Sequence, residues 1–137
     1  MSDFVVDNSV VMTWAFEDES ADYADAVLES LEISEAVVPA IWRLEVANVL
    51  VCAERIGRLQ STDTLKFLEL IGQLPIVLCE TRTSIRNVID IARETGLSAY
   101  DASYLDLAIA RNLPLATLDA KLRKAAASAG VDLWLEG

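Results

Sequence analysis

Apolar residues occur in this chain as short runs, separated by longer segments whose apolar positions recur at helical spacing. Short apolar runs bounded by polar residues, glycine or proline are typical of buried strands. The first run ends at Asp7, and the second is closed by Pro39. The pattern predicts five short strands, at residues 4–6, 36–38, 75–79, 115–118 and 131–134.

The longer segments predict helices because their apolar residues return every third or fourth position, which places them on one face. Tyr23, Val27 and Leu31 follow this spacing in a segment that Ser20 is suited to cap. Gly96 stands where another helix should stop. The expected helices cover residues 10–16, 20–34, 39–55, 61–71, 84–95, 98–112 and 119–128.

Short apolar strands that alternate with helices are typical of a parallel sheet covered on both faces. We therefore expect an α/β fold with three layers, α/β/α, around a central, mostly parallel sheet of about five short strands. A length of 137 residues suits one domain, so residues 1–137 are expected to form a single domain. Sites in such sheets form at the carboxyl ends of the strands, where Asp7 and Asp119 stand.

Composition narrows the chemistry that this fold can carry. Histidine is absent, which excludes Ser-His-Asp and Cys-His catalysis and histidine-ligated metal sites. Cys52 and Cys79 lie among apolar residues without metal-ligand spacing and are expected to be buried free thiols. Neither a leader nor a membrane-spanning apolar segment is evident, so we expect a cytoplasmic protein with no membrane contact.

The net charge of −11 argues against nucleic-acid binding by bulk attraction, but the charge is unevenly placed. Residues 1–42 contain ten acidic residues and no lysine or arginine, whereas residues 43–137 contain twelve acidic and eleven basic residues. The second part is therefore close to neutral and has basic side chains to meet phosphates. These are Arg43, Arg55, Arg58, Arg82, Arg86, Lys121, Arg123 and Lys124.

Two carboxylates that follow strands also have a simple structural explanation. Asp7 stands ahead of a short predicted helix, where aspartate is a favourable N-cap, although Ser9 is equally able to cap it. Asp119 stands ahead of the last predicted helix in the same way. From the residues alone, each remains open between a helix cap and a functional group.

Two further carboxylates lie on inward faces of predicted helices. Glu45 shares its face with Trp42, and Asp101 shares its face with Tyr104. An ionised carboxylate in such a position is costly unless a cation pairs with it. The alternatives are a salt bridge to a buried arginine for Glu45, and a capping box begun by Ser98 for Asp101.

Taken together, these acids predict a metal site. Several carboxylates that converge without histidine favour a hard, oxygen-binding cation such as Mg²⁺ or Mn²⁺. Asn48 lies on the same predicted face as Glu45 and is expected to support it through its amide. The proposed set is Asp7, Glu45, Asp101 and Asp119.

Four segments of the chain resemble the motifs of PIN-domain nucleases, and their order, their spacing and the chain length resemble the VapC-type toxins of toxin–antitoxin pairs. The resemblance covers essentially the whole chain. It rests on the four motifs occurring in order, because any one of them alone is common. The segments are residues 5–10, 39–50, 97–108 and 116–122.

The resemblance implies a PIN-like domain that acts as a Mg²⁺-dependent endoribonuclease on RNA, with Mn²⁺ as a substitute. It further implies a homodimer and a cognate antitoxin protein whose tail covers the site. The acidic segment at residues 17–35 is then either a solvated surface or a docking surface for a basic antitoxin segment. The catalytic, metal-binding acids that the resemblance implies are Asp7, Glu45, Asp101 and Asp119, oriented by the hydroxyls of Ser9 and Thr117.

Three other functions compete with this interpretation. A PIN-fold nuclease that processes RNA without an antitoxin would have the same site. A non-catalytic acidic interaction module would use the four carboxylates as caps and salt bridges and would be indifferent to metal. A phosphatase with an aspartyl nucleophile, of the haloacid dehalogenase type, is disfavoured because Ser9 stands where its second aspartate is expected.

Overall fold

Short strands form a parallel sheet of four in the part of the chain that the computed structural model describes, residues 3–19, 21–80 and 84–136. The sheet order is β3-β2-β1-β4, so the chain fills one side of β1 before it returns to the other. This reversal makes the gap between the carboxyl ends of β1 and β4 the switch point, where sites form in such sheets. The strands are β1 (Phe4–Val6), β2 (Ala36–Val38), β3 (Ile76–Leu78) and β4 (Leu115–Ala116).

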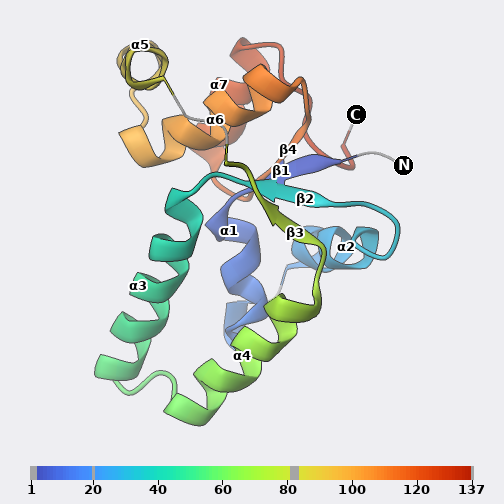
Figure 1. Ribbon diagram of the computed structural model, residues 1–137, viewed down its shortest axis with the longest axis vertical. Helices are drawn as coiled ribbons and strands as arrows, with labels where there is room; N and C mark the ends of the chain where they lie inside the picture. The colour runs from blue at the N-terminus through green and yellow to red at the C-terminus, as the bar shows by residue number, and fades with distance from the viewer. Residues whose placement is uncertain (1–2, 20, 81–83, 137) are drawn as a thin grey trace.

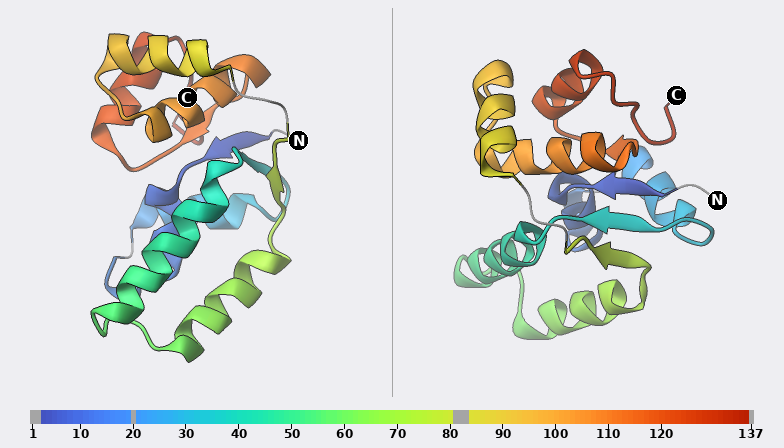
Figure 2. Two further views of the ribbon diagram at one scale, coloured as in Figure 1. Left: turned by 60° about the vertical axis from the view of Figure 1, so that its left-hand side comes forward. Right: turned by 45° about the horizontal axis from the view of Figure 1, so that its top comes forward.

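Helices cover both faces of the sheet, which confirms the three-layer α/β/α arrangement. Figures 1 and 2 show α5, α6 and α7 on one side and α1, α2, α3 and α4 on the other. Among the described residues, no helix is both long and apolar enough to cross a membrane. The helices are α1 (Asn8–Val11), α2 (Asp22–Ser30), α3 (Ile41–Arg55), α4 (Ser61–Gln73), α5 (Ile85–Thr95), α6 (Ala99–Arg111) and α7 (Ala120–Ser128), with short 3₁₀ turns at Met12–Trp14 (η1) and Glu17–Glu19 (η2).

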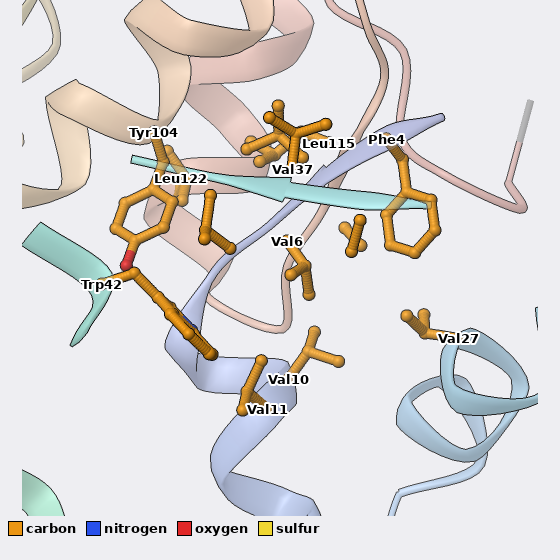
Figure 3. Packing of buried hydrophobic residues seen from close by; sticks show 14 of the residues in the cluster. Phe4, Val6, Val10, Val11, Val27, Val37, Trp42, Tyr104, Leu115 and Leu122 are labelled. Atoms are coloured by element: carbon orange, nitrogen blue, oxygen red, sulfur yellow. The ribbon is translucent and has the colours of Figure 1, made fainter. Parts of the chain in front are cut away.

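The core is built around β1, whose three residues are completely buried. Val10 and Val11 of α1 pack on one side, and Tyr104 of α6 reaches in from the other layer (Figure 3). Burial of an aliphatic side chain of this size stabilises a fold by roughly 1.5–3 kcal/mol. The core therefore fixes the carboxyl end of β1 firmly in place.

The predicted fifth strand, at residues 131–134, is not part of the sheet. Leu133 makes only an isolated parallel bridge to Leu115. The segment is instead held by Trp134, whose ring stacks on Phe4 with centroids 4.5 Å apart and whose Nε1 donates to Ser30 Oγ at 3.0 Å. The segment also makes two backbone hydrogen bonds to β4, from Leu115 N–H to Asp132 O and from Trp134 N–H to Leu115 O, both at 2.9 Å. It therefore lies alongside β4 without forming a strand, and its apolar residues are half-buried.

Two local expectations also change. The second helix is shorter than predicted, because it begins at Asp22 after Ala21 and ends at Ser30; the proposed cap Ser20 lies outside the described residues. On α3 the buried stripe is Trp42, Val46, Leu50 and Ala53, so Cys52 is exposed rather than buried, whereas Cys79 is buried as expected.

Candidate active site

Asp7 is the first residue after β1 and is only 4% exposed. It occupies the N-cap position of α1, yet its side chain makes no capping hydrogen bond. Two hydroxyls hold its carboxylate instead: Ser9 Oγ donates to Oδ1 at 2.6 Å, and Thr117 Oγ1 donates to Oδ2 at 2.7 Å. The two hydroxyls, one from α1 and one from the loop after β4, therefore orient this side chain.

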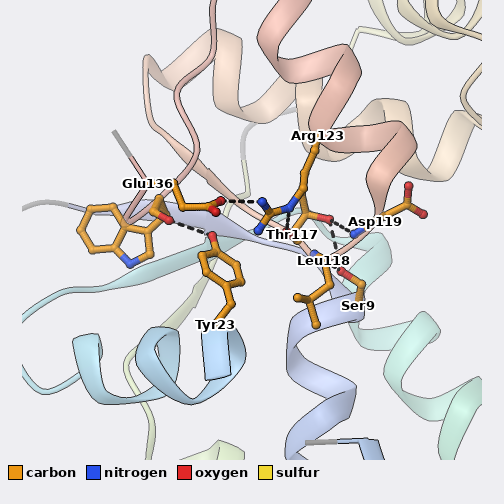
Figure 4. Close-up of polar contacts among 8 residues, drawn as sticks. Ser9, Tyr23, Thr117, Leu118, Asp119, Arg123 and Glu136 are labelled. Atoms are coloured by element: carbon orange, nitrogen blue, oxygen red, sulfur yellow. Dashed lines mark hydrogen bonds and ion pairs between the residues drawn. The ribbon is translucent and has the colours of Figure 1, made fainter. Parts of the chain in front are cut away.

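Backbone N–H groups set the direction of both hydroxyls. Leu118 N–H donates to Ser9 Oγ at 2.8 Å, and Asp119 N–H donates to Thr117 Oγ1 at 3.0 Å (Figure 4). Each hydroxyl oxygen thus accepts a backbone hydrogen and directs its own hydrogen at Asp7. The loop after β4 and the start of α1 are thus joined both through the Asp7 carboxylate and directly through Ser9.

The surroundings of Asp7 disfavour the ionised form of its carboxylate. Its pKa is raised from 3.8 to about 6, mainly by burial and in smaller part by the charge of Asp101, even though the hydrogen bonds from Ser9 and Thr117 oppose this shift. Among the described residues, no lysine or arginine forms an ion pair with Asp7. A carboxylate in this position is poised to be neutralised by a bound cation.

Glu45 lies in the second turn of α3 and is half-buried. Tyr104 Oη donates to Glu45 Oε1 at 2.5 Å. Burial raises the pKa of Glu45, the Tyr104 hydrogen bond lowers it, and the charge of Asp101 raises it. A salt bridge to a buried arginine, the alternative considered from the sequence, is not formed by the described residues.

Asp101 and Asp119 stand in the first turn of α6 and at the N-cap of α7. Asp119 does cap its helix, since Oδ1 accepts from Leu122 N–H at 3.0 Å. At α6 the cap is Ser98, whose Oγ accepts from the backbone N–H of Asp101 at 3.1 Å. Burial raises the pKa of Asp101, and the charge of Asp119 raises it further. These two carboxylates therefore lie within electrostatic range of each other, and Asp101 links them to Asp7 and Glu45.

Asn48 is exposed, and its Oδ1 accepts from Cys52 Sγ at 3.8 Å. It lies one turn beyond Glu45 on α3, and no hydrogen bond joins the two side chains among the described residues. The support expected from Asn48 stays a prediction.

Tyr104 and Arg123 support the candidate site in ways that the sequence does not predict. Tyr104 was expected only to pack. Arg123 donates through Nε to the carbonyl oxygen of Thr117 at 2.7 Å, lies 4.7 Å over the Tyr23 ring and pairs with Glu136 (Figure 4). It thus braces the backbone of the residue that orients Asp7. A basic residue four positions after a helix-capping aspartate carries no distinctive sequence signal.

The family model of the PIN domain matches residues 4–128. The chain belongs to the PIN domain family. PIN domains are generally nucleases, and they generally use divalent metal ions. No curated protein matches the chain.

Solved structures share the PIN fold with this chain at low sequence identity. PAE2754 from Pyrobaculum aerophilum is 24% identical, with a TM-score of 0.69 over 90% of this chain and 86% of that one. A toxin–antitoxin complex from Klebsiella pneumoniae contains a chain that is 17% identical, with a TM-score of 0.60 over 88% of this chain and 89% of that one.

The donors of this PIN domain fit a divalent ion in their chemistry. They are oxygen atoms only, and the buried carboxylate of Asp7 has no basic ion-pair partner among the described residues. The described residues contain no group of three or more His, Cys, Asp or Glu side chains arranged to hold an ion as they stand.

Proposed function

We propose that this PIN domain is the toxin of a type II toxin–antitoxin pair and acts as a Mg²⁺-dependent endoribonuclease. The observation that carries the proposal is the buried Asp7, whose two carboxylate oxygens are separately oriented by Ser9 and Thr117 beside the switch point of the sheet. The PIN family and the fold shared with a toxin–antitoxin complex support it.

The proposed ligands of Mg²⁺, or of Mn²⁺ in its place, are Asp7, Glu45, Asp101 and Asp119. The charge of Asp101 raises the pKa of Asp7 and of Glu45, and the charge of Asp119 raises that of Asp101, which supports a shared site in which a bound divalent cation would reduce repulsion. Asp119 uses Oδ1 for its helix cap and Glu45 uses Oε1 for Tyr104, so each has its second oxygen available. Ser9 and Thr117 hold Asp7, and Asn48 is the remaining supporting residue.

The proposed reaction is hydrolysis: water attacks phosphorus and the P–O3′ bond breaks, which leaves a 5′-phosphate and a 3′-hydroxyl. The chemistry that Mg²⁺ supplies when bound is neutralisation of phosphate charge and activation of water at neutral pH. Because the chain lacks histidine, a carboxylate takes the proton of the attacking water. The candidates to take this proton are the acids that are less buried than Asp7, namely Glu45, Asp101 and Asp119.

The test is cleavage of a mixed RNA pool by the purified chain, with and without Mg²⁺, followed by mapping of the cut ends. A single-stranded DNA pool tests the preference for RNA. Asp101→Asn should abolish cleavage while the thermal unfolding midpoint is retained, whereas Asp90→Asn on the exposed side of α5 should leave cleavage unchanged. Full activity of Asp101→Asn in Mg²⁺ would show that the proposed carboxylate site is not the site of cleavage.

The partners in this proposal are RNA, a second copy of the chain and an antitoxin. Light scattering after gel filtration measures whether the free chain is a homodimer. Co-expression with the small gene adjacent to the coding sequence tests the antitoxin, which should co-purify and suppress cleavage. Cleavage that no neighbouring gene product suppresses would favour an RNA-processing PIN nuclease, and indifference to Mg²⁺ and Mn²⁺ would favour a non-catalytic module.

A further inference from the structure

Tyr104 is a nearly inaccessible tyrosine whose only polar atom reaches the candidate site. The residue is 1% exposed, and its ring extends from α6 toward α3 (Figure 3). Its hydroxyl donates to Glu45 Oε1 at 2.5 Å, although the two residues are 59 positions apart. A hydrogen bond of this kind, from a buried hydroxyl to a carboxylate, is short and strong.

In this bond the phenol of Tyr104 is the donor and Glu45 Oε1 is the acceptor. This leaves Oε2 as the oxygen of Glu45 that is available to another partner.

The same bond also relates two of the proposed ligands. Tyr104 follows Asp101 by three positions on α6, so the two side chains lie on one helix face. Glu45 is on α3, which covers the opposite side of the sheet (Figure 2). Fixing Tyr104 to Glu45 therefore fixes the helix that carries Asp101 relative to the helix that carries Glu45.

We propose that Tyr104 is a positioning residue, which restrains Glu45 through Oε1 and leaves Oε2 free to bind the divalent cation. It does for Glu45 what Ser9 and Thr117 do for Asp7. This inference rests on the proposed function, because it assigns a role within that metal site. Partners that orient a metal ligand typically contribute 10–100-fold to metal affinity or activity.

The experiment measures Mn²⁺ binding to the full chain without RNA, by the electron paramagnetic resonance signal of free Mn²⁺. Tyr104→Phe should weaken binding by about 10-fold or more, since it removes only the hydroxyl. Tyr100→Phe is the matched control, because Tyr100 is on the same helix but 59% exposed, and it should bind Mn²⁺ like the wild type. Cleavage by Tyr104→Phe should show a lower kcat with little change in KM for RNA.

A double-mutant cycle separates positioning from general packing. In a Glu45→Gln background, Tyr104→Phe should cause little further loss of Mn²⁺ affinity, because the carboxylate that it positions is already gone. An equal loss in both backgrounds, or unchanged affinity of the single variant, would overturn the inference. Thermal unfolding shows whether each variant is folded. If Tyr104→Phe does not fold, the Mn²⁺ affinity of Glu45→Gln tests the inference instead. Unchanged Mn²⁺ affinity of Glu45→Gln would show that Glu45 does not bind the cation, so that Tyr104 has no ligand to position.

Mn²⁺ binding to the wild type separates the proposed function from the proposed role of Tyr104. Binding of Mn²⁺ that Asp7→Asn removes, together with unchanged binding by Tyr104→Phe, would leave the proposed function intact and refute the role of Tyr104. Absence of Mn²⁺ binding to the wild type would refute the metal site itself, and the positioning role with it.

Discussion

The hydroxyl of Thr117 donates its hydrogen to Asp7 Oδ2 at 2.7 Å, across 110 positions of the chain. The two residues follow β1 and β4, which are neighbours in the sheet, with Val6 paired to Ala116. Parallel pairing of these strands brings both chain exits to the same edge. The carboxylate orientation is consequently set by the sheet and exists before any cation or substrate arrives.

Removing this hydroxyl should weaken both the site and the fold. Thr117→Val keeps the shape of the side chain but removes the donor to Asp7 and the acceptor for Asp119 N–H. Loss of buried hydrogen-bond partners destabilises by about 1–3 kcal/mol, which urea denaturation measures. Thr117→Ser is the control and should retain most stability and cleavage. Equal behaviour of the valine and serine variants would contradict this role for the hydroxyl.

Asp7 should make the metal-free protein less stable at neutral pH. Its folded pKa of about 6 lies above the ordinary value of 3.8, so its favourable contribution is complete below 3.8 and is lost as the pH rises through 6. The ionised group therefore disfavours the fold by about 3 kcal/mol at pH 7.5 relative to acid pH. Asp7→Asn should raise the unfolding midpoint in EDTA at pH 7.5, and this gain should shrink as the pH falls toward 4.

Two comparisons make that measurement decisive. Asp25→Asn, on the exposed face of α2, should leave the midpoint nearly unchanged at both pH values. Mg²⁺ should stabilise the wild type but not Asp7→Asn, because a ligand that binds only the folded state adds to its stability. A variant that is less stable than the wild type at pH 7.5 in EDTA would show that the two hydroxyl bonds outweigh the burial of charge.

Much of the fold is readable from the sequence because its helix ends carry local chemistry. Ser84, Ser98 and Asp119 accept hydrogen bonds from the third residue beyond them, as their positions predict, and Gly96 ends α5 with a positive φ of 74°. These signals need no tertiary contact. The final segment instead makes only an isolated bridge to β4, and Trp134 stacks on Phe4 at the other end of the chain, a contact that local spacing does not encode.

The candidate site can be predicted only in part, because some of its geometry depends on tertiary contacts. Strand ends and helix starts located the acids, but the direction of a helical side chain depends on which stripe the rest of the protein covers. On α3 the neighbouring stripes are both apolar: Leu44 is 68% exposed, whereas Leu50 is buried. The pattern alone therefore placed Cys52 inside. The bond from Tyr104 to Glu45 joins two helices on opposite faces of the sheet, which local spacing does not encode.

Lys121 should contribute to RNA binding rather than to metal binding. It is exposed near the start of α7, its Nζ donates to the carbonyl oxygen of Gly96 at 2.6 Å, and its charge lowers the pKa of Asp101. Under the proposed function, Lys121→Gln should raise KM for RNA several-fold, leave Mn²⁺ affinity unchanged and reduce the salt dependence of binding by the equivalent of one phosphate contact. Lys124→Gln, on the same helix, is the control, and an equal effect of both would indicate general charge attraction.

The acidic segment at residues 17–35 is partly neutralised within the chain. Arg58 pairs with Asp18 at 3.0 Å and with Glu19 at 2.8 Å, and its guanidinium lies 3.9 Å from the centroid of the Phe16 ring. On and after α2, by contrast, Glu29 and Glu32 are exposed. A basic segment of an antitoxin would therefore find its free acidic partners at α2 rather than at η2.

Reversing the charge at α2 tests this docking surface. The double substitution Glu29→Lys with Glu32→Lys should weaken the complex with a co-purifying antitoxin by about tenfold or more, and flatten its salt dependence, because like charges repel across an interface. The control is Asp90→Lys with Glu94→Lys on α5, which changes the net charge by the same amount on another exposed helix. If α2 is the docking surface, this control variant should bind the antitoxin like the wild type. Unchanged affinity of the α2 variant would identify this surface as merely solvated, and equal losses at both helices would attribute binding to the overall charge of the chain.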